Sequence, residues 1–297
     1  MTNGGAGATI ALLGTGLMGS RMARRLLGAR HSLAVWNRSP EKADALRGDG
    51  ARIAETPADA VRGASHVITM LADGPTVRAV LDDGLLEAME PGAVLIDMSS
   101  IKPGEARDHA AMLRERGLDH LDAPVSGGTK GAEAGMLAIM AGGRAETFDA
   151  AARVFAPMGR AVHVGPDGSG QLAKLANQTI VAVTIGAVAE AVLLAQAGGA
   201  DADALREALK GGFADSVILQ QHGGRMTARD FEPGGLSKFQ LKDLRNATDE
   251  AEALDLSLPL AGQMRERFTA LVEEMDGGDL DHSAILLELE RRNGRQA

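Results

Sequence analysis

The sequence predicts an α/β domain with a parallel sheet, followed by an all-helical domain. In the first half, short apolar runs alternate with helical patterns, which is typical of parallel strands joined by right-handed crossovers. After about Gly165 no alternating strand pattern remains, and helical patterns follow one another. The turn-forming run "GPDGSG" separates the two parts. We therefore expect domains at 1–165 and 166–297, a division that the length of 297 residues also favours.

Each expected strand is a short run of aliphatic residues, and each expected helix has apolar residues three or four positions apart. The strands are expected at 9–14, 32–37, 66–71, 93–98, 119–125, 137–142 and 161–165. Helices are expected at 17–28, 39–50, 101–117, 169–200, 201–212, 236–255, 259–278 and 282–293. In the first of these helices Met18, Met22 and Leu26 share one face.

Composition excludes several classes of function. Aromatic residues make up only 2% of the chain, so the core must be aliphatic. The net charge of −9, without a basic run, argues against a nucleic-acid partner. The chain has no cysteine, which excludes disulfides and thiolate chemistry. The N-terminal "MTNGGAGA" does not resemble a secretory signal, and we expect a cytoplasmic protein.

One apolar stretch is long enough to cross a bilayer, namely "TIVAVTIGAVAEAVLLAQAGGA". Glu190 lies near its middle, and a charge at mid-membrane costs at least about 2.5 kcal/mol. We therefore expect a helix that other parts of the protein bury on most sides, and no membrane partner.

Three glycines after the first expected strand form the pattern G-x-G-x-x-G. Gly14, Gly16 and Gly19 lie between a strand and a helix, the context in which this pattern binds a dinucleotide. The first glycine permits a tight turn, the second lets a pyrophosphate approach, and the third allows close packing. The helix N-terminus attracts the phosphates. A plain tight turn is the alternative, and the surrounding strand–helix pattern favours a Rossmann cofactor site.

The end of the second expected strand indicates which dinucleotide binds. An Asp or Glu there would hold the ribose 2′-hydroxyl of NAD. The sequence has Asn37, Arg38 and Ser39 instead, so no carboxylate repels a 2′-phosphate and a guanidinium can pair with it. We expect NADP, with NAD possible as well. The alternative is that Arg38 is a solvated loop residue.

Two further loops should also reach the cofactor, because ligands of open α/β sheets gather at the carboxyl ends of the strands. They are "MLADGPTV" after the third expected strand and "DMSSIKP" after the fourth, where Ser99 and Ser100 could donate hydrogen bonds near the nicotinamide. The complete set of expected cofactor contacts comprises Gly14, Gly16, Leu17, Met18, Gly19, Asn37, Arg38, Ser39, Leu71, Ala72, Asp73, Val77, Ser100 and Lys242.

The segment "DAPVSGGTKGAEAG" lacks the GK[ST] of a P-loop. Ser126, Gly127 and Gly128 could present a hydroxyl and backbone N–H groups in a small concavity that binds a carboxylate. A crossover loop rich in glycine for steric reasons explains the segment equally well.

The longest expected helix begins "GQLAKLANQ", which puts Lys174 and Asn177 on one face. A lysine inside a largely buried helix needs a partner or a function. Beside a nicotinamide, its ammonium could stabilise a developing alkoxide and donate the proton. Asn177 could position the substrate or orient the lysine. For a lone lysine, an extended side chain at the surface is the competing interpretation.

Metal chemistry finds no support in the residue spacing. The seven histidines show no HExxH or comparable arrangement, so we expect no metal site. A Ser-His-Asp hydrolase would need a G-x-S-x-G elbow between a strand and a helix, and "GPDGSGQ" does not supply one.

Taken together, the motifs resemble those of the β-hydroxyacid dehydrogenase family, which includes the 3-hydroxyisobutyrate dehydrogenases, over nearly the whole chain. "GTGLMGSRMA" resembles the cofactor motif, "DAPVSGGTKGAEAG" the substrate motif and "GQLAKLANQ" the catalytic motif. "KDLRNA", with Lys242 and Asp243, resembles a late segment that closes over the cofactor. Thr15 and Ala72 depart from the residues that are common in the family at these positions.

The resemblance implies roles for these residues. Lys174 would be the general acid in reduction and the general base in oxidation, assisted by Asn177. Ser126, Gly127 and Gly128 would hold a substrate carboxylate, and Lys242 would lie near both nicotinamide and substrate. It also implies a Rossmann domain and a helical domain joined by a long helix, an active site at the domain cleft, and a homodimer or homotetramer.

Within the family the sequence is most similar to the subgroup that interconverts tartronate semialdehyde and glycerate, on the segments "VLIDMSSI", "KLANQTIVA" and "DHSA". Oxidation of 3-hydroxyisobutyrate and reduction of succinic semialdehyde are sibling alternatives. Imine reductases resemble the first domain but usually replace the helix lysine with Asp or Tyr, and Lys174 argues against them. Non-enzymatic relatives lack this lysine altogether.

Overall fold

The computed structural model describes residues 7–295 of the chain. The protein folds as two units, Met1–Lys174 and Leu175–Ala297. The division lies nine residues after the boundary predicted at 165/166, because the first turns of the long helix pack with the sheet. Each unit is described by itself below.

A nine-stranded sheet organises the first unit, with the order β3-β2-β1-β4-β5-β6-β8-β7 and β9 beside β8. The first six strands are parallel neighbours in the order that dinucleotide-binding domains use. The strands are β1 (Thr9–Leu13), β2 (Ser32–Trp36), β3 (Arg52–Ile53), β4 (His66–Thr69), β5 (Val94–Asp97), β6 (Asp119–Asp122), β7 (Val125–Ser126), β8 (Leu137–Gly143) and β9 (Gly159–Gly165).

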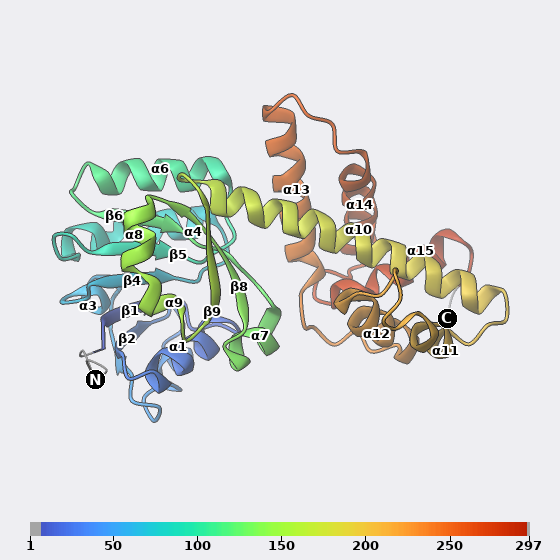
Figure 1. Ribbon diagram of the computed structural model, residues 1–297, viewed down its shortest axis with the longest axis horizontal. Helices are drawn as coiled ribbons and strands as arrows, with labels where there is room; N and C mark the ends of the chain where they lie inside the picture. Colours follow the sequence, from blue (N-terminus) through green and yellow to red (C-terminus); the bar gives the residue numbers. More distant parts are fainter. Residues whose placement is uncertain (1–6, 296–297) are drawn as a thin grey trace. The chain divides into compact units, whose positions relative to one another are not determined.

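Helices cover both faces of this sheet, as alternation along β1 demonstrates. Ile10 and Leu12 belong to one apolar cluster, whereas Ala11 and Leu13 belong to another on the opposite face. Figure 1 shows α1 along one side of the sheet and α6 along the other. The helices of this unit are α1 (Gly19–Gly28), α2 (Pro40–Asp44), α3 (Pro57–Val61), α4 (Gly74–Val80), the π-helical η1 (Leu81–Leu85), α5 (Leu86–Ala88), α6 (Pro103–Arg114), α7 (Gly128–Ala134), α8 (Ala145–Ala150) and α9 (Ala152–Phe155).

The predicted α/β class is confirmed, but the far edge of the sheet differs from the expectation. The run expected as one strand at 119–125 is two short strands, β6 and β7, which Pro124 separates. Strand β8 runs antiparallel to both β6 and β7, and β9 pairs parallel to β8, so the sheet is mixed beyond its first six strands. The two-residue strand β3 has no period that could have been recognised in the sequence.

The second unit contains helices throughout its described part, as predicted. Its apolar core includes Ile185, Leu244, Phe268 and Ile285, all fully buried. The elements are α10 (Ser169–Ala197, which begins in the first unit), α11 (Ala202–Leu209), η2 (Leu219–Gly223), α12 (Gly224–Ala228), α13 (Ser237–Ala253), α14 (Pro259–Thr269), η3 (Ala270–Glu274), η4 (His282–Ala284) and α15 (Ile285–Arg292). The sequence patterns did not predict η2 and α12.

Helix α10 is, between residues 7 and 295, the one helix that is long and apolar enough to span a membrane. The expectation that it is buried on most sides is wrong for this chain, since only 33% of its most apolar window is buried. Ile180 and Leu194 are exposed at 65% and 76%. Glu190 pairs with Arg267 of α14 at 3.3 Å, so its charge has a partner within the helical unit.

Candidate functional site

The three glycines of the first turn have the three conformational roles expected of a dinucleotide site. Gly14 has a φ of +101°, and a Cβ there would collide with the Met70 carbonyl oxygen. A Cβ on Gly16 would meet nothing within 4 Å, so the backbone is open to an approaching ligand. A Cβ on Gly19 would strike the carbonyl oxygen of Gly14, so this position permits helix α1 to pack closely on the strand.

Polar groups of the same turn also fit a bound cofactor. The N-cap of α1, Met18, supplies no side-chain cap, which leaves the helix N-terminus available to a phosphate. Leu17 beside it is 63% exposed. The hydroxyl of Thr15 is buried without a hydrogen-bond partner among the described residues. A buried hydroxyl without a partner is costly, and a ligand in this turn would satisfy it.

Asn37 ties the glycine turn to the end of β2. Its Oδ1 accepts from the Thr15 N–H at 2.9 Å, and its Nδ2 donates to the Ser39 carbonyl at 3.0 Å. Arg38 next to it is exposed and has no hydrogen-bond partner in the part of the chain that the structure describes. A hollow of about 710 Å³ begins at Asn37 and is lined further by Pro40, Arg47 and Glu55. Within the described residues, the exposed Arg38 guanidinium therefore has no hydrogen-bond partner that would compete with a phosphate.

The loop after β4 carries four predicted cofactor contacts in different environments. Ala72 is exposed, and Leu71 is half-buried with its N–H donating to Ser99 Oγ at 2.9 Å. Asp73 caps α4, accepting from the Thr76 N–H at 2.9 Å. Val77 lies fully buried in an apolar core cluster. The geometry gives Asp73 and Val77 structural roles, and their contacts with a cofactor stay predictions.

The two serines after β5 differ in their exposure. Ser99 is fully buried, and its carbonyl accepts from Gln171 Nε2 at 2.8 Å, so it joins this loop to α10. Ser100 is half-buried at the carboxyl edge of the sheet. Of the two, Ser100 has the exposure that a ligand contact requires.

The segment after β7 has the conformation of an anion-binding concavity. Gly127 and Gly128 have φ values of +135° and +60°, which side chains rarely adopt. Both glycines are exposed, and Gly127 begins α7 without a side-chain cap. The half-buried Ser126 precedes them. Successive backbone N–H groups in such a turn can hold a carboxylate.

Lys174 lies beside this segment. Its side chain comes from α10 and is largely buried, with 9% exposure. The Nζ donates to the carbonyl oxygen of Val125 at 2.9 Å, and Val125 directly precedes Ser126. The structure therefore brings together the predicted general acid and the predicted carboxylate site, which are far apart in the sequence.

In the helical unit, a chain of polar contacts connects Asn177 with Lys242. Asn177 Nδ2 donates to Gln178 Oε1 at 2.9 Å, and Gln178 Nε2 donates to Asp243 Oδ2 at 2.8 Å. Asp243 is buried and pairs with Lys242 Nζ at 3.4 Å. Gln178 is thus a connecting residue to which the sequence analysis gave no role, although it ends the motif "GQLAKLANQ".

Asp122 and Gln171 were not predicted from the sequence either, and both are fully buried polar residues, Asp122 at the end of β6 and Gln171 in the first turn of α10. Asp122 accepts hydrogen bonds from the N–H groups of Gly168 and Gln171 at 2.9 and 2.8 Å. Asp122 begins the motif "DAPVSGGTKGAEAG", and Gln171 lies in "GQLAKLANQ" one helical turn before Lys174, so both motifs could have drawn attention to them.

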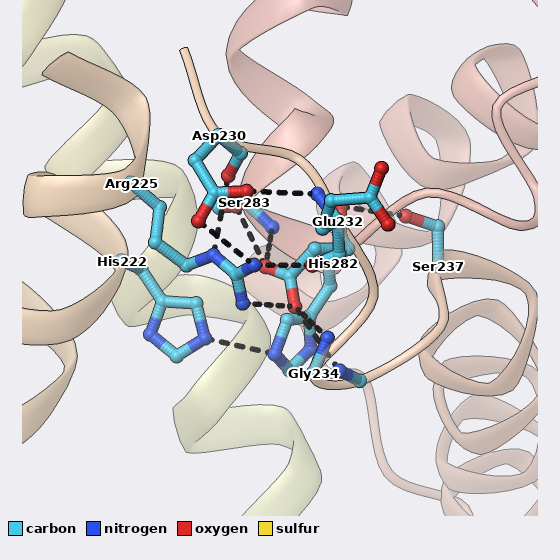
Figure 2. A network of polar contacts seen from close by, with 10 residues as sticks. His222, Arg225, Asp230, Glu232, Gly234, Ser237, His282 and Ser283 are labelled. Atoms are coloured by element: carbon cyan, nitrogen blue, oxygen red, sulfur yellow. Dashed lines mark hydrogen bonds and ion pairs between the residues drawn. The ribbon is translucent and has the colours of Figure 1, made fainter. Parts of the chain in front are cut away.

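A cluster in the helical unit has a composition that could hold a metal, in contrast to the expectation from spacing. His222, Asp281 and His282 offer ligand atoms within 4.8 Å of one another, and the two Nε2 atoms lie 2.8 Å apart. Figure 2 shows a dashed line between the nitrogens of the two imidazoles, which lie edge to face, and the Arg225 guanidinium beside them. The histidines are separated by 60 residues, so no spacing motif could have indicated this pair.

The hydrogen bonds of Asp281 favour a structural role for this cluster. Its Oδ2 accepts from Arg225 and from the N–H groups of Gly234 and Gly235, and its Oδ1 accepts from Ser283. Both oxygens are therefore already used, and the Arg225 guanidinium at 3.2 Å would repel a cation. The arrangement is that of a clamp that fixes the start of η4.

Comparison with known proteins agrees with the geometry of both units. Residues 9–165 match the family described as the NAD binding domain of 6-phosphogluconate dehydrogenase. Residues 168–289 match the family described as NAD-binding of NADP-dependent 3-hydroxyisobutyrate dehydrogenase. The first match alone covers more than half of the chain.

Individual relatives extend over almost the full length. The chain is 42% identical to 2-hydroxy-3-oxopropionate reductase of Escherichia coli, over 95% of this chain and 97% of that protein. It is 38% identical to an NAD-dependent L-serine dehydrogenase of Pseudomonas aeruginosa, over 89% and 92%. A solved structure of Mycobacterium tuberculosis 3-hydroxyisobutyrate dehydrogenase with L-serine shares 34% identity and a TM-score of 0.87, over 95% and 99%.

These matches confirm the resemblance that the motifs indicated and the class of chemistry that follows from it. The relatives are named as dehydrogenases and reductases that act on hydroxyl groups, with NAD-binding domains. The chain therefore belongs to the β-hydroxyacid dehydrogenase family and is an NAD(P)-dependent oxidoreductase.

Proposed function

We propose that this protein is an NADPH-dependent reductase of a small carboxylated aldehyde, and that the aldehyde is tartronate semialdehyde, reduced to glycerate. The observation that carries the proposal is the position of Lys174 Nζ, 2.9 Å from the carbonyl of Val125 and so next to Ser126, Gly127 and Gly128. A substrate whose carboxylate binds those glycines would have its aldehyde carbon close to the ammonium. The 42% identity to a reductase of this substrate supports the same choice.

In the proposed reaction, different residues bind the substrate and donate the proton. When bound, the nicotinamide cofactor would supply a hydride to the carbonyl carbon of the substrate. Lys174 stabilises the negative charge that develops on the carbonyl oxygen and donates its proton there, so the product is an alcohol. Ser126 and the N–H groups after it hold the carboxylate and so fix the distance between substrate and lysine. The family resemblance implies that Asn177 would assist the lysine and that Lys242 would contribute to binding of nicotinamide and substrate.

The preference for NADPH rests on the end of β2. Asn37, Arg38 and Ser39 present a guanidinium and no carboxylate to the ribose, and Arg38 is exposed without a competing partner among the described residues. Pairing with a 2′-phosphate is the strongest interaction available to such a guanidinium. The match of the helical unit to an NADP-dependent family supports this assignment.

The experiment that tests the substrate is a comparison of kcat/KM with NADPH for tartronate semialdehyde and for succinic semialdehyde. A preference for the three-carbon aldehyde is expected, because the glycine segment and Lys174 are close together. A preference for the longer aldehyde would remove the substrate assignment and keep the role of Lys174. Inactivity with both would contradict the proposed reaction.

A second candidate reaction is oxidation of a 3-hydroxy acid such as 3-hydroxyisobutyrate or L-serine. Relatives named for both substrates share 34–38% identity with this chain. Lys174 would then accept the hydroxyl proton as general base. Assay of L-serine with NAD and NADP distinguishes this reaction, since activity there above that with the semialdehydes would displace the first proposal. The presence of Lys174 remains the argument against imine reduction.

We also propose that the protein acts as a homodimer or homotetramer. The exposed Ile180 and Leu194 lie on α10, and such apolar side chains are stabilised by a second copy of the chain. Light scattering coupled to gel filtration tests this proposal, and a monomer at micromolar concentration would contradict it.

A further inference from the structure

The start of α10 is capped by a carboxylate that comes from the sheet. Asp122 is the last residue of β6 and is fully buried. Its Oδ1 accepts from the Gly168 N–H at 2.9 Å, just before the helix, and its Oδ2 accepts from the Gln171 N–H at 2.8 Å, in the first turn. The N–H groups of a first helical turn have no partner within the helix, so this side chain satisfies two of them.

Tight backbone packing fixes the cap in one position. A Cβ on Gly142 of β8 would lie only 2.5 Å from Asp122 Oδ1 and 2.7 Å from the Gly170 N. A Cβ on Gly170 would collide with the carbonyl oxygen of Asp122. The helix therefore approaches the sheet through two glycines, and the carboxylate fits between them without room for a longer side chain.

Gln171 connects the same turn of α10 to the loop that follows β5. Its Oε1 accepts from the Ile101 N–H at 3.1 Å, and its Nε2 donates to the Ser99 carbonyl at 2.8 Å. Lys174 follows Gln171 by one helical turn and reaches the Val125 carbonyl. The position of the Lys174 ammonium relative to Ser126 thus depends on where this first turn is held.

We propose that Asp122 is a positioning residue for Lys174, acting as the buried negative cap that holds the first turn of α10 against the sheet. The inference rests on the proposed role of Lys174 as general acid. An ionised carboxylate suits this place, because it binds both N–H groups and interacts favourably with the helix N-terminus. A displacement of about 1 Å at a reacting group can cost about a hundredfold in rate, so the cap matters for turnover more than for binding.

The ionisation of Asp122 falls in a range that experiments can reach. Burial raises the pKa of Asp122 to about 6, against the effect of the Gln171 and Gly168 N–H groups. Asp167, ahead of α10, contributes to this raised pKa as a smaller cause than burial, and Arg114 of α6 pairs with Asp167. On β6 itself, burial lowers the pKa of His120 to about 3, so that ring is neutral. On β5, burial raises the pKa of Asp97 as well.

The test compares Asp122→Asn with Asp119→Asn. Asparagine keeps the shape of the side chain but has one acceptor oxygen and no charge. Asp119 lies at the other end of the same strand, where it contacts Arg144 and Thr147. The expected result for D122N is a kcat for the aldehyde lowered about ten- to hundredfold, with little change in KM for NADPH. D119N should keep the kcat of the natural chain.

The pH profile supplies a readout that a merely structural role would not give. In the natural chain, kcat should fall on the acid side with an apparent pKa near 6, as Asp122 gains a proton. In D122N this acid limb should be absent, because the residue at 122 no longer titrates. An acid limb of the same shape in D122N would overturn the proposal.

Amide hydrogen exchange tests the cap without activity. The amides of Gly168 and Gln171 should exchange faster in D122N than in D119N. If these amides exchange faster in D122N but kcat is unchanged, Asp122 does not position Lys174. If their exchange is unchanged, Asp122 does not cap α10. A Lys174→Ala variant that keeps full activity would instead refute the proposed role of the lysine, whatever D122N does.

Discussion

Each unit of the protein holds a buried aspartate at the start of a helical segment, and the two aspartates are in opposite electrostatic environments. Asp122 in the first unit binds two backbone N–H groups, and burial raises its pKa to about 6. Burial also acts to raise the pKa of Asp281, but His282 and the hydrogen bonds from Ser283 and Gly235 lower it overall. Arg225 lies at 3.2 Å.

The difference teaches that the same capping geometry serves two purposes. The Asp281 clamp has an ionic partner and several hydrogen bonds, so its charge persists and it stabilises the helical unit. Asp122 caps the helix that carries Lys174 and can gain or lose a proton near neutral pH. We therefore expect substitutions around Lys174 to change activity, and substitutions around Asp281 to change the free energy of unfolding.

The largest effect should come from Lys174→Ala. Loss of an acid–base group lowers kcat by about 10²–10⁴-fold, and the free energy of unfolding should change much less than kcat. Steady-state kinetics with NADPH and the aldehyde measure this effect. Lys210→Ala, an exposed lysine paired with Glu207, is the matched control and should be fully active. Near-normal turnover of K174A would contradict the mechanism.

The next largest effect should be on stability, from Asp281→Ala. Removing the Asp281 carboxylate leaves the N–H groups of Gly234, Gly235 and Ser283 without their buried acceptor and takes one of two carboxylates from Arg225, at a cost of about 3 kcal/mol. Urea unfolding measures the change. Asp230 pairs with the same Arg225 but is 52% exposed, so Asp230→Ala should cost less than about 1 kcal/mol. If D281A and D230A lost the same free energy of unfolding, the buried Asp281 would stabilise the helical unit no more than the exposed Asp230 does, and the prediction would be wrong.

An effect on binding alone is expected from Arg38→Ala. Loss of a charge-assisted contact with the 2′-phosphate should raise KM for NADPH about ten- to hundredfold and leave KM for NADH nearly unchanged. Arg47→Ala is the control, because Arg47 lines the hollow that begins at the neighbouring Asn37 but pairs with Asp44. Similar effects of R38A on both cofactors would contradict NADP specificity.

The smallest effect should appear in the pH dependence of stability. Burial lowers the pKa of His222 below 6.5, so the unfolded chain binds this proton more readily and the folded state loses stability as the pH falls below 6.5. Asp122 has a raised pKa, so its contribution has the opposite sign and grows as the pH falls from about 6 toward 3.8.

Urea unfolding of His222→Gln and of the natural chain at pH 5, 6 and 7 separates the first of these contributions. The stability difference between the two proteins should shift in favour of H222Q at lower pH, by less than about 1.4 kcal/mol per pH unit. The effect of the fully buried His120 is present in both proteins and cancels. A difference that does not depend on pH would show that His222 does not titrate there.

Much of the first unit could be predicted because its signals are local. A dinucleotide site needs a glycine in a tight turn, a second where the backbone is open to the ligand, and a third where helix and strand pack closely. Gly14, Gly16 and Gly19 have these three environments. The alternation of strands and helices predicted the parallel strands, because a strand buried on both faces is a short apolar run. Strand β3 and strand β7, which follows Pro124, have only two residues each, and such strands are too short for an apolar pattern to be recognised.

The sequence by itself determined the order of the elements, the cofactor turn, the long helix with Lys174 and Asn177, and the family. Only the tertiary structure decided which polar side chains act together. Asp122 and Gln171 are 49 residues apart, and His222 and His282 are 60 apart. No local period connects such residues, because their contacts depend on how sheet and helices pack. The same packing brings Lys174 to Val125, and that contact supports the proposed reaction.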